Sequence, residues 1–237
     1  MTGEHFWAVI PAAGISERMG GDVPKQYFSL RGRPVIEHTL NRFCTHPRIK
    51  GVVVVIAEHD SHWQALELPY SNQVIVATGG VERCHSVLTG LKAAETVARS
   101  EDWVLVHDAA RPCVREEDIN RLLDVLADDP VGGLLALPVR DTIKRGQLDN
   151  TVQATVERHG LWHALTPQMF RLEALRCAIE AALAQGQKVT DEAQAMELAG
   201  AAPRLVEGHS DNIKITNRED LALAELYLRR QEREACA

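Results

Sequence analysis

The sequence has no apolar run long enough to cross a membrane. Its longest apolar stretches, at residues 51–57 and 132–139, fall well short of the roughly 20 residues that a membrane helix needs. The N-terminus also lacks the basic start and the small-residue cleavage site of a signal peptide. These absences predict a cytoplasmic protein with no membrane partner.

Cysteine is scarce and scattered. Five cysteines occur, an odd number, and no two of them form a C-x-x-C pair. This spacing indicates neither a disulfide framework nor a zinc site, so we expect reduced thiols.

A surplus of basic residues is also missing. The formal net charge at pH 7 is -7, whereas non-specific affinity for DNA or RNA comes mostly from clustered lysines and arginines that neutralise phosphates. We therefore expect no nucleic acid partner. Any phosphate must be bound locally, where a few basic residues meet turns of small residues.

What is present is the pattern of a single α/β domain. A length of 237 residues, of which 45% are hydrophobic, fits one domain spanning 1–237 with a sizeable core. Short β-branched runs alternate with helical periodicity, which is typical of βαβ units around a mostly parallel, Rossmann-like sheet. Strands are predicted at 6–10, 52–57, 74–77, 103–107, 133–138 and 204–207. Helices are predicted at 34–44, 83–98, 116–127, 172–185, 191–198 and 219–233.

One segment, residues 140–158, departs from this pattern. It alternates polar and apolar residues around the turn Gly-Gln-Leu-Asp-Asn, as a two-stranded ribbon does. Because an isolated hairpin with so little apolar surface is only marginally stable, we expect it to pack on another subunit as a dimerisation arm. The alternative is a flap that lies on its own domain.

A turn of small residues follows the first predicted strand directly. Residues 11–20 read Pro-Ala-Ala-Gly-Ile-Ser-Glu-Arg-Met-Gly, and Pro-Lys-Gln-Tyr follows at 24–27. Small residues let a ligand approach the backbone, whose N–H groups can bind phosphate, and Arg18 and Lys25 add positive charge. The spacing matches neither a dinucleotide fingerprint nor a P-loop. Taken alone, such a turn is as well explained as an ordinary strand-to-helix connection.

Together with six later motifs, this turn resembles the nucleotide loop of the 2-C-methyl-D-erythritol 4-phosphate cytidylyltransferase family. The motifs are G-G-x-x-R-x-x-S-V at 79–87, H-D-A-A-R-P at 107–112, P-V-R-D-T at 138–142, L-W-H-A-L-T-P-Q at 161–168, T-D-E-A at 190–193 and N-I-K-I-T at 212–216. The resemblance spans nearly the whole chain. It implies a three-layer nucleotidyltransferase domain with a protruding β-arm. It also implies a homodimeric enzyme of non-mevalonate isoprenoid biosynthesis that transfers CMP from CTP to 2-C-methyl-D-erythritol 4-phosphate.

The resemblance assigns one set of residues to CTP and to catalysis. Nucleotide-binding residues are Pro11, Ala12, Ala13, Gly14, Gly80, Arg83 and Ser86; catalytic residues are Arg18, Lys25 and Asp108, and Asp108 also binds Mg²⁺. Asp108 ends a predicted strand, where open α/β sheets bind ligands, and one carboxylate suits Mg²⁺ that also contacts substrate phosphates. Without the motifs, Asp108 and Ser86 are equally well explained as caps and Arg83 as a surface ion pair. Ser16 and Val81 depart from the family pattern, which leaves the loop shape and the ribose contacts open.

A second set is assigned by the same resemblance to the acceptor. It comprises Ala109, Arg111, Thr142, Arg158, Thr166, Thr190 and Lys214. Its cations and hydroxyls suit a phosphate monoester, because Arg can bind phosphate bidentately while Thr hydroxyls orient the remaining oxygens. Thr142 and Arg158 lie on the arm and, in the family, reach the active site of the partner subunit; Thr166 is a candidate for the same contribution. As isolated residues, each is a solvated charge or a turn hydroxyl.

The implied reaction requires no general base. A phosphate monoester with a second pKa near about 6 is mostly dianionic at pH 7, so its oxygen can attack the α-phosphate of CTP directly. The sequence offers no Ser-His-Asp, Cys-His or paired-carboxylate arrangement, and we assign His107 no catalytic role. We expect catalysis by positioning and by charge neutralisation.

Two other functions are compatible with parts of this pattern. A ribitol 5-phosphate cytidylyltransferase would use the same loop, although the motifs at 161–168 and 190–193 favour the methylerythritol phosphate enzyme. A non-catalytic nucleotide sensor would keep the fold, but the presence of Arg18, Lys25 and Asp108 argues against loss of the active site.

Overall fold

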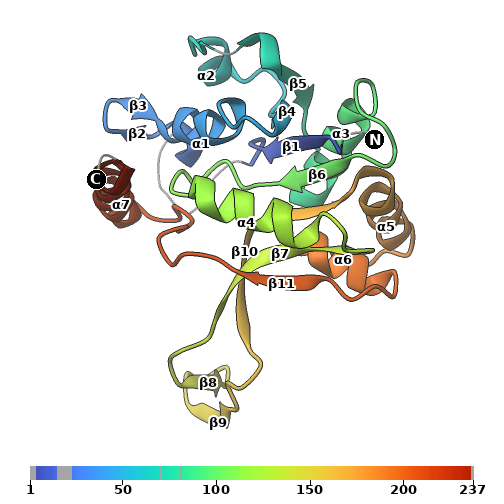
Figure 1. The fold of residues 1–237 in the computed structure, drawn as a ribbon. Helices are drawn as coiled ribbons and strands as arrows, with labels where there is room; N and C mark the ends of the chain where they lie inside the picture. Colours follow the sequence, from blue (N-terminus) through green and yellow to red (C-terminus); the bar gives the residue numbers. More distant parts are fainter. Residues whose placement is uncertain (1–3, 15–22, 70, 81, 236–237) are drawn as a thin grey trace.

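The centre of the molecule is a seven-stranded sheet in a computed structural model that describes residues 4–14, 23–69, 71–80 and 82–235 (Figure 1). The order across the sheet is β11 (Arg204–Glu207), β7 (Gly132–Pro138), β10 (Trp162–Arg171), β6 (Trp103–Val106), β1 (Phe6–Pro11), β4 (Ile49–Ile56) and β5 (Val74–Thr78). β10 is antiparallel to both neighbours, and the other six strands share one direction. The prediction of a mostly parallel sheet is confirmed.

Helices cover both faces of this sheet. Successive strand side chains point to opposite faces, so Ala8 and Ile10 of β1 pack with α1 (Val35–Cys44) and α4 (Glu116–Leu126). Val9 packs on the other face with α3 (Arg83–Ala94), α5 (Leu172–Ala184) and α6 (Glu192–Leu198). The predicted three-layer α/β architecture is therefore confirmed.

A third buried cluster holds the C-terminal helix α7 (Glu219–Ala235) against the motif at 212–216 and against segments that follow β1 and β6. Ala224 and Leu228 of this helix pack with Leu30 and Ile215. The Ile215 N–H donates to the Ala110 carbonyl at 2.8 Å. This bond ties the C-terminal motif to the turn after β6. In the part of the chain that is described, no helix is both long and apolar enough to cross a membrane.

Smaller elements complete the fold. They are β2 (Ser29–Leu30), β3 (Arg33–Pro34), the helix α2 (Ser61–Gln64) and the 3-10 turns at Lys25–Tyr27 and Ser71–Gln73. Helix α3 ends at Ala94, four residues before its predicted end at 98, where the Thr96 hydroxyl donates to the Ala93 carbonyl. A side-chain bond of this kind competes with helix continuation.

Strand β10 was not predicted, because its sequence does not look like a central strand. It contains Pro167, which cannot donate to a ladder, and the polar residues Thr166 and Gln168, both buried. The strand accommodates them through a shift in its pairing with β7 between Ala164 and Gln168. Each buried polar side chain then finds a partner: Thr166 bonds His107, and Gln168 bonds Asp191.

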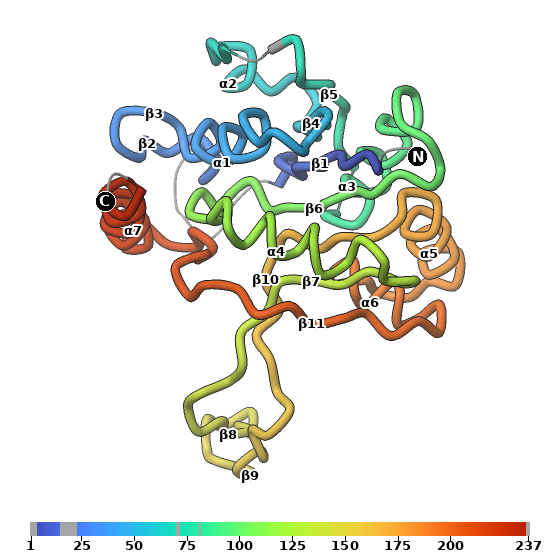
Figure 2. Tube along the Cα trace, in the orientation of Figure 1, coloured from blue at the N-terminus to red at the C-terminus, as the bar shows by residue number. Residues whose placement is uncertain are grey.

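The ribbon predicted at 140–158 is present as β8 (Ile143–Gly146) and β9 (Val152–Val156), paired antiparallel. Figures 1 and 2 show it projecting away from the sheet, between β7 and β10. Its apolar residues Leu148 and Val152 are exposed. In this chain the ribbon is therefore an arm, not a flap folded onto its own domain.

Candidate active site

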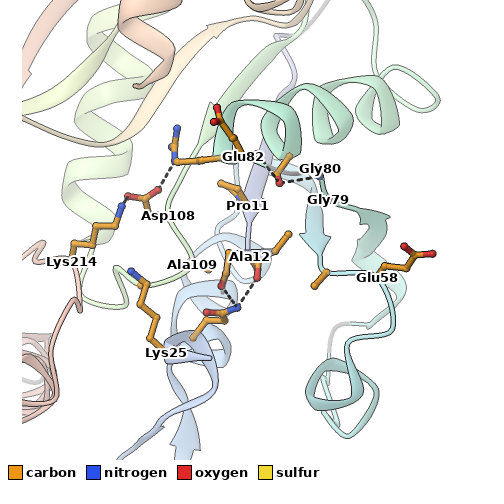
Figure 3. Close-up of a pocket in the computed structure, with 17 residues that line it drawn as sticks. Pro11, Ala12, Lys25, Glu58, Gly79, Gly80, Glu82, Asp108, Ala109 and Lys214 are labelled. Carbon is orange, nitrogen blue, oxygen red and sulfur yellow. Dashed lines mark hydrogen bonds and ion pairs between the residues drawn. The ribbon is translucent and has the colours of Figure 1, made fainter. Parts of the chain in front are cut away.

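A cavity of about 610 Å³ opens at the carboxyl ends of the parallel strands β1, β4, β5 and β6 (Figure 3). The chain turns away from the sheet there, so the residues after each strand line one space. The lining residues are Pro11, Ala12, Ala13, Gly14, Lys25, Gln26, Ala57, Glu58, Gly79, Gly80, Glu82, Arg83, Ser86, Asp108, Ala109, Ala110 and Lys214. The structure thus brings together all of the predicted nucleotide-binding residues, together with Lys25, Asp108, Ala109 and Lys214.

The segment after β1 is held in place by the side chain of Gln26, a residue for which the sequence indicates no role. The buried Gln26 amide donates to the Ala12 carbonyl at 2.6 Å, with a longer contact to the Gly14 carbonyl at 3.5 Å. These bonds fix the small-residue turn next to Lys25. Arg18, predicted to be catalytic, lies outside the described residues, as do Ser16 and Val81.

The turn at Gly79 and Gly80 needs glycine for close packing. A Cβ at Gly79 would lie 2.3 Å from the Ala13 Cβ, and one at Gly80 would lie 2.4 Å from the Cβ of His85. The Gly80 N–H donates to the Ser86 hydroxyl oxygen at 3.2 Å, and that hydroxyl donates to the Glu82 carbonyl. Ser86 therefore holds this turn against the start of α3 as well as lining the cavity.

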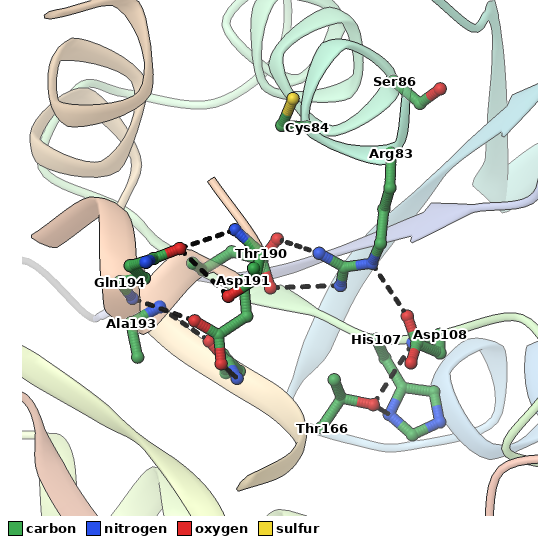
Figure 4. Close-up of polar contacts among 12 residues, drawn as sticks. Arg83, Cys84, Ser86, His107, Asp108, Thr166, Thr190, Asp191, Ala193 and Gln194 are labelled. Carbon is green, nitrogen blue, oxygen red and sulfur yellow. Dashed lines mark hydrogen bonds and ion pairs between the residues drawn. The ribbon is translucent and has the colours of Figure 1, made fainter. Parts of the chain in front are cut away.

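Asp108 is the electrostatic centre of the site (Figure 4). Its Oδ1 accepts from Arg83 Nε at 3.0 Å, and its Oδ2 lies 2.9 Å from Lys214 Nζ and 3.5 Å from Arg111 Nε. Burial alone would raise the pKa of Asp108, but the positive charges of Arg83, Lys214 and Arg111 outweigh it and lower the pKa well below its usual range. Asp108 is therefore ionised at neutral pH.

Glu192 holds Arg83 in place, a role that was missed from the sequence. Its carboxylate is buried and binds Arg83 bidentately, at 2.6 Å to Nη1 and 3.1 Å to Nη2. Burial lowers the pKa of Arg83, but the charges of Glu192 and Asp108 outweigh this and raise it. Arg83 is thereby fixed between two carboxylates. Glu192 belongs to the motif T-D-E-A at 190–193, but nothing in that motif indicates that its carboxylate bonds Arg83, 109 residues away.

His107 is a neutral residue that supports the backbone of Asp108 through Thr166. Its Nε2 lies 3.0 Å from the Arg111 carbonyl, which can only accept, so Nε2 carries the proton. Nδ1 then accepts from the Thr166 hydroxyl at 3.0 Å, and the Thr166 oxygen accepts from the Asp108 N–H. Burial lowers the pKa of His107 to about 4. These contacts agree with a structural role for His107.

Only some of the residues predicted to bind the acceptor lie at the cavity in this chain. Ala109 and Lys214 line the cavity, while Arg111 lies beside Asp108 and donates to the Asn212 carbonyl at 2.8 Å. Buried Thr166 lies under Asp108 rather than in the cavity wall. The three others, Thr142, Arg158 and Thr190, are exposed and do not line the cavity. Arg158 donates to the Arg140 carbonyl on the arm, and Thr190 donates to Gln194.

The donor chemistry at Asp108 fits Mg²⁺. A carboxylate offers about four lone-pair positions, and Arg83, Lys214 and Arg111 occupy three of them. Mg²⁺ binds proteins through one or two carboxylates together with substrate phosphates. The cavity beside Asp108 provides the space for those phosphates.

Comparisons with known proteins agree over most of the chain. The model of the family described as IspD, 2-C-methyl-D-erythritol 4-phosphate cytidylyltransferase, matches residues 6–230. The chain is 57% identical over 217 residues to the protein of that name from Pseudomonas paraeruginosa, covering 91% of this chain and 93% of the relative. It is 49% identical over 225 residues to the one from Vibrio vulnificus, covering 95% of each.

Solved structures with the same description share the fold. The Francisella tularensis 2-C-methyl-D-erythritol 4-phosphate cytidylyltransferase superposes with a TM-score of 0.82 at 35% identity, over 94% of this chain and 100% of that one. The Thermus thermophilus protein superposes with a TM-score of 0.76 at 31% identity, over 94% and 98%.

Proposed function

This chain belongs to the 2-C-methyl-D-erythritol 4-phosphate cytidylyltransferase family, and on that premise we propose that the cavity beside Asp108 is its active site. The chain is a CTP-dependent cytidylyltransferase of non-mevalonate isoprenoid biosynthesis. It transfers CMP to 2-C-methyl-D-erythritol 4-phosphate, giving 4-diphosphocytidyl-2-C-methyl-D-erythritol and pyrophosphate. The placement of the active site rests on one observation: a group of cations surrounds one buried carboxylate at the carboxyl ends of the strands.

The nucleoside is held by the two small-residue turns. We assign it to Pro11, Ala12, Ala13, Gly14, Gly80, Arg83 and Ser86, all of which line the cavity. The close packing of Gly79 and Gly80 brings the backbone of both turns together, and the small residues of both turns let cytosine approach that backbone closely. Arg83 contributes through its position between Glu192 and Asp108.

Catalysis depends on positioning the two substrates and on neutralising the charge of their phosphates. An oxygen of the acceptor phosphate attacks the α-phosphorus of CTP, and the bond from that phosphorus to the oxygen bridging to the β-phosphate breaks, so that pyrophosphate leaves. Lys25 and Lys214, both in the cavity wall, together with Arg18, stabilise the negative charge that gathers on the phosphates. The acceptor enters as the dianion, so no side chain has to remove a proton.

Mg²⁺ bound to Asp108 would supply further neutralisation of the triphosphate. Asp108 is its ligand in this proposal, because it is ionised at neutral pH and lines the cavity. The cations around it, Arg83, Lys214 and Arg111, keep the carboxylate in place and limit the cost of burying it.

The acceptor site is completed by a second subunit. Arg111 and Lys214 meet at Asp108, but Thr142 and Arg158 lie on the exposed arm, which carries the apolar side chains of Leu148 and Val152 into solvent. We assign Thr142 and Arg158 to the site of a partner in a cytoplasmic homodimer. Thr166 acts on the acceptor side through its bond to the Asp108 N–H, and Thr190 is assigned there by the family motif, although it does not line the cavity of this chain. Each chain is then one catalytic domain, residues 1–237, with residues 140–158 as the dimerisation arm.

A matrix of substrates tests this function. Pyrophosphate release is measured with CTP, UTP, ATP or GTP, each with 2-C-methyl-D-erythritol 4-phosphate or with ribitol 5-phosphate, with and without Mg²⁺. We expect release from CTP with the methylerythritol acceptor only, and only with the metal. Faster turnover on ribitol 5-phosphate, or binding of CTP without release, would contradict the proposal.

A further inference from the structure

The first turn of α3 brings together three side chains that commonly bind metals, on the rim of the cavity and apart from Asp108. Cys84 Sγ lies 3.8 Å from Glu82 Oε2 and 3.9 Å from His85 Nδ1. The three ligand atoms all lie within 4.8 Å of one another. Within residues 4–14, 23–69, 71–80 and 82–235, no other three His, Cys, Asp or Glu side chains are grouped in this way.

The two separations from the Cys84 sulfur are close to those of a tetrahedral zinc site. Zinc lies about 2.3 Å from a thiolate and about 2.0–2.2 Å from an imidazole nitrogen or a carboxylate oxygen, so tetrahedral angles place sulfur about 3.6 Å from either partner. The distances in this cluster exceed that value by only a few tenths of an ångström. Glu82 is exposed, so its side chain can make up the difference without a change in the backbone.

We propose that Glu82, Cys84 and His85 form a binding site for a thiophilic divalent transition metal of the zinc class. A set of one thiolate, one imidazole and one carboxylate favours zinc, cobalt or cadmium over magnesium or calcium, which prefer oxygen ligands. Three protein ligands leave a fourth position for water. On binding, the Cys84 thiol loses its proton to solvent and the sulfur takes the metal in its place.

The ligands are attached to a firmly packed backbone. Cys84 is buried and packs at the start of α3, and the Cβ of His85 lies against Gly80, where an added Cβ would come within 2.4 Å. Figure 4 shows Cys84 on the same helical turn as Arg83 and Ser86, and both of these line the cavity. A bound ion would therefore join the side chains of the turn that shapes the cavity wall, and we expect slower amide hydrogen exchange there.

The sequence does not indicate this site, because its cysteines are unpaired. One cysteine flanked by a histidine and a nearby glutamate carries no C-x-x-C signal. Helical spacing does not indicate it either, because residues one or two positions apart do not face each other on a helix. Glu82 meets Cys84 because it is the N-cap residue, whose backbone is extended, before the helix begins.

Cobalt is the probe that tests the site, because thiolate ligation gives Co²⁺ a charge-transfer absorption and tetrahedral geometry gives it strong visible bands. The background is untagged protein in which Cys177, which is exposed, and Cys236, which lies outside the described residues, are both replaced by serine. Cys44 and Cys113 are buried and remain. We expect one Co²⁺ per chain, displaced by Zn²⁺, and a slowed exchange of the amides at 83–87.

Variants of the cluster decide the outcome. Cys84→Ser should abolish the charge-transfer band, and His85→Ala should weaken binding by more than the roughly 10–100-fold that loss of an outer partner costs. His59→Ala, an exposed histidine outside the cluster, is the matched control. No band at about millimolar Co²⁺, a band that survives Cys84→Ser, or unchanged affinity in His85→Ala would each overturn the proposal. Thermal unfolding is recorded for every variant, and His85→Ala carries the test if Cys84→Ser does not fold. None of these readouts depends on transferase activity.

Discussion

His107 lies wholly inside the protein as a neutral imidazole, so mild acid should destabilise the fold through this one residue. Burial lowers its pKa from 6.5 to about 4, although its bond to the Arg111 carbonyl and the charge of Asp108 act in the opposite direction. The unfolded chain therefore binds a proton at pH values where the folded chain does not. The stability that His107 confers is fully present above about pH 6.5 and is lost as the pH falls toward about 4.

The size of the effect follows from the two pKa values. At about 1.36 kcal/mol for each pKa unit, the complete loss is about 3 kcal/mol. Between about pH 7.5 and about pH 5, where the titration is not yet complete, the same relation gives about 2 kcal/mol. This is a large part of the total stability of an ordinary domain, about 5–15 kcal/mol.

Urea unfolding of the wild type and of His107→Gln at both pH values isolates this contribution. Glutamine can donate to the Arg111 carbonyl and accept from Thr166 but does not titrate, so the advantage of the wild type should shrink by about 2 kcal/mol at the lower pH. Burial also lowers the pKa of His38 and His46. Both residues are present in the wild type and in the variant, so their contributions cancel in the difference between the two free energies of unfolding. His159→Gln, at an exposed position, should leave the pH dependence unchanged. A difference between wild type and His107→Gln that stays constant within about 0.5 kcal/mol would refute the reasoning.

Three further predictions concern the active site. Lys25→Ala should lower turnover at saturating CTP by at least about a hundredfold, the usual cost of removing one transition-state donor. Near-normal turnover in a folded variant would contradict its role. The control is Lys92→Ala, on the surface of α3. Mixed dimers of Arg158→Ala and Lys25→Ala chains should regain activity that neither homodimer has, because one of the two sites then receives both intact residues. No recovery in verified heterodimers would place the whole site in one chain. Glu192→Gln should lower the free energy of unfolding by about 2–3 kcal/mol, since Arg83 loses a charged, bidentate partner, whereas Glu197→Gln on the exposed face of the same helix should change it by less than about 0.5 kcal/mol.

Much of the fold could be read from local patterns. The strands and helices follow from runs of β-branched residues and from helical spacing, which depend on neighbours a few positions away. The same holds for the arm, where alternation around a turn indicated a hairpin. β10 was missed because Thr166, Pro167 and Gln168 are unfavourable in a central strand, and only their tertiary partners make them acceptable.

The active site could be predicted only in part. Gly14, Gly80 and Asp108, which all line the cavity, were assigned from the family motifs. For Asp108 the position at the end of a predicted strand, where open α/β sheets bind ligands, pointed the same way. The residues that hold others in place were not identified, since spacing does not show that Gln26 bonds the Ala12 carbonyl or that Glu192 bonds Arg83.

By itself, then, the sequence determined most of the helices and strands, the family motifs and the edge of the sheet where the motifs lie, because side-chain preferences and strand direction act over short stretches of chain. Only the tertiary structure decided that β10 enters between β6 and β7 and places Thr166 beneath Asp108. It also decided that Arg83 is clamped between Asp108 and Glu192. Such contacts join residues far apart in sequence and depend on how the whole core packs, which no local pattern encodes.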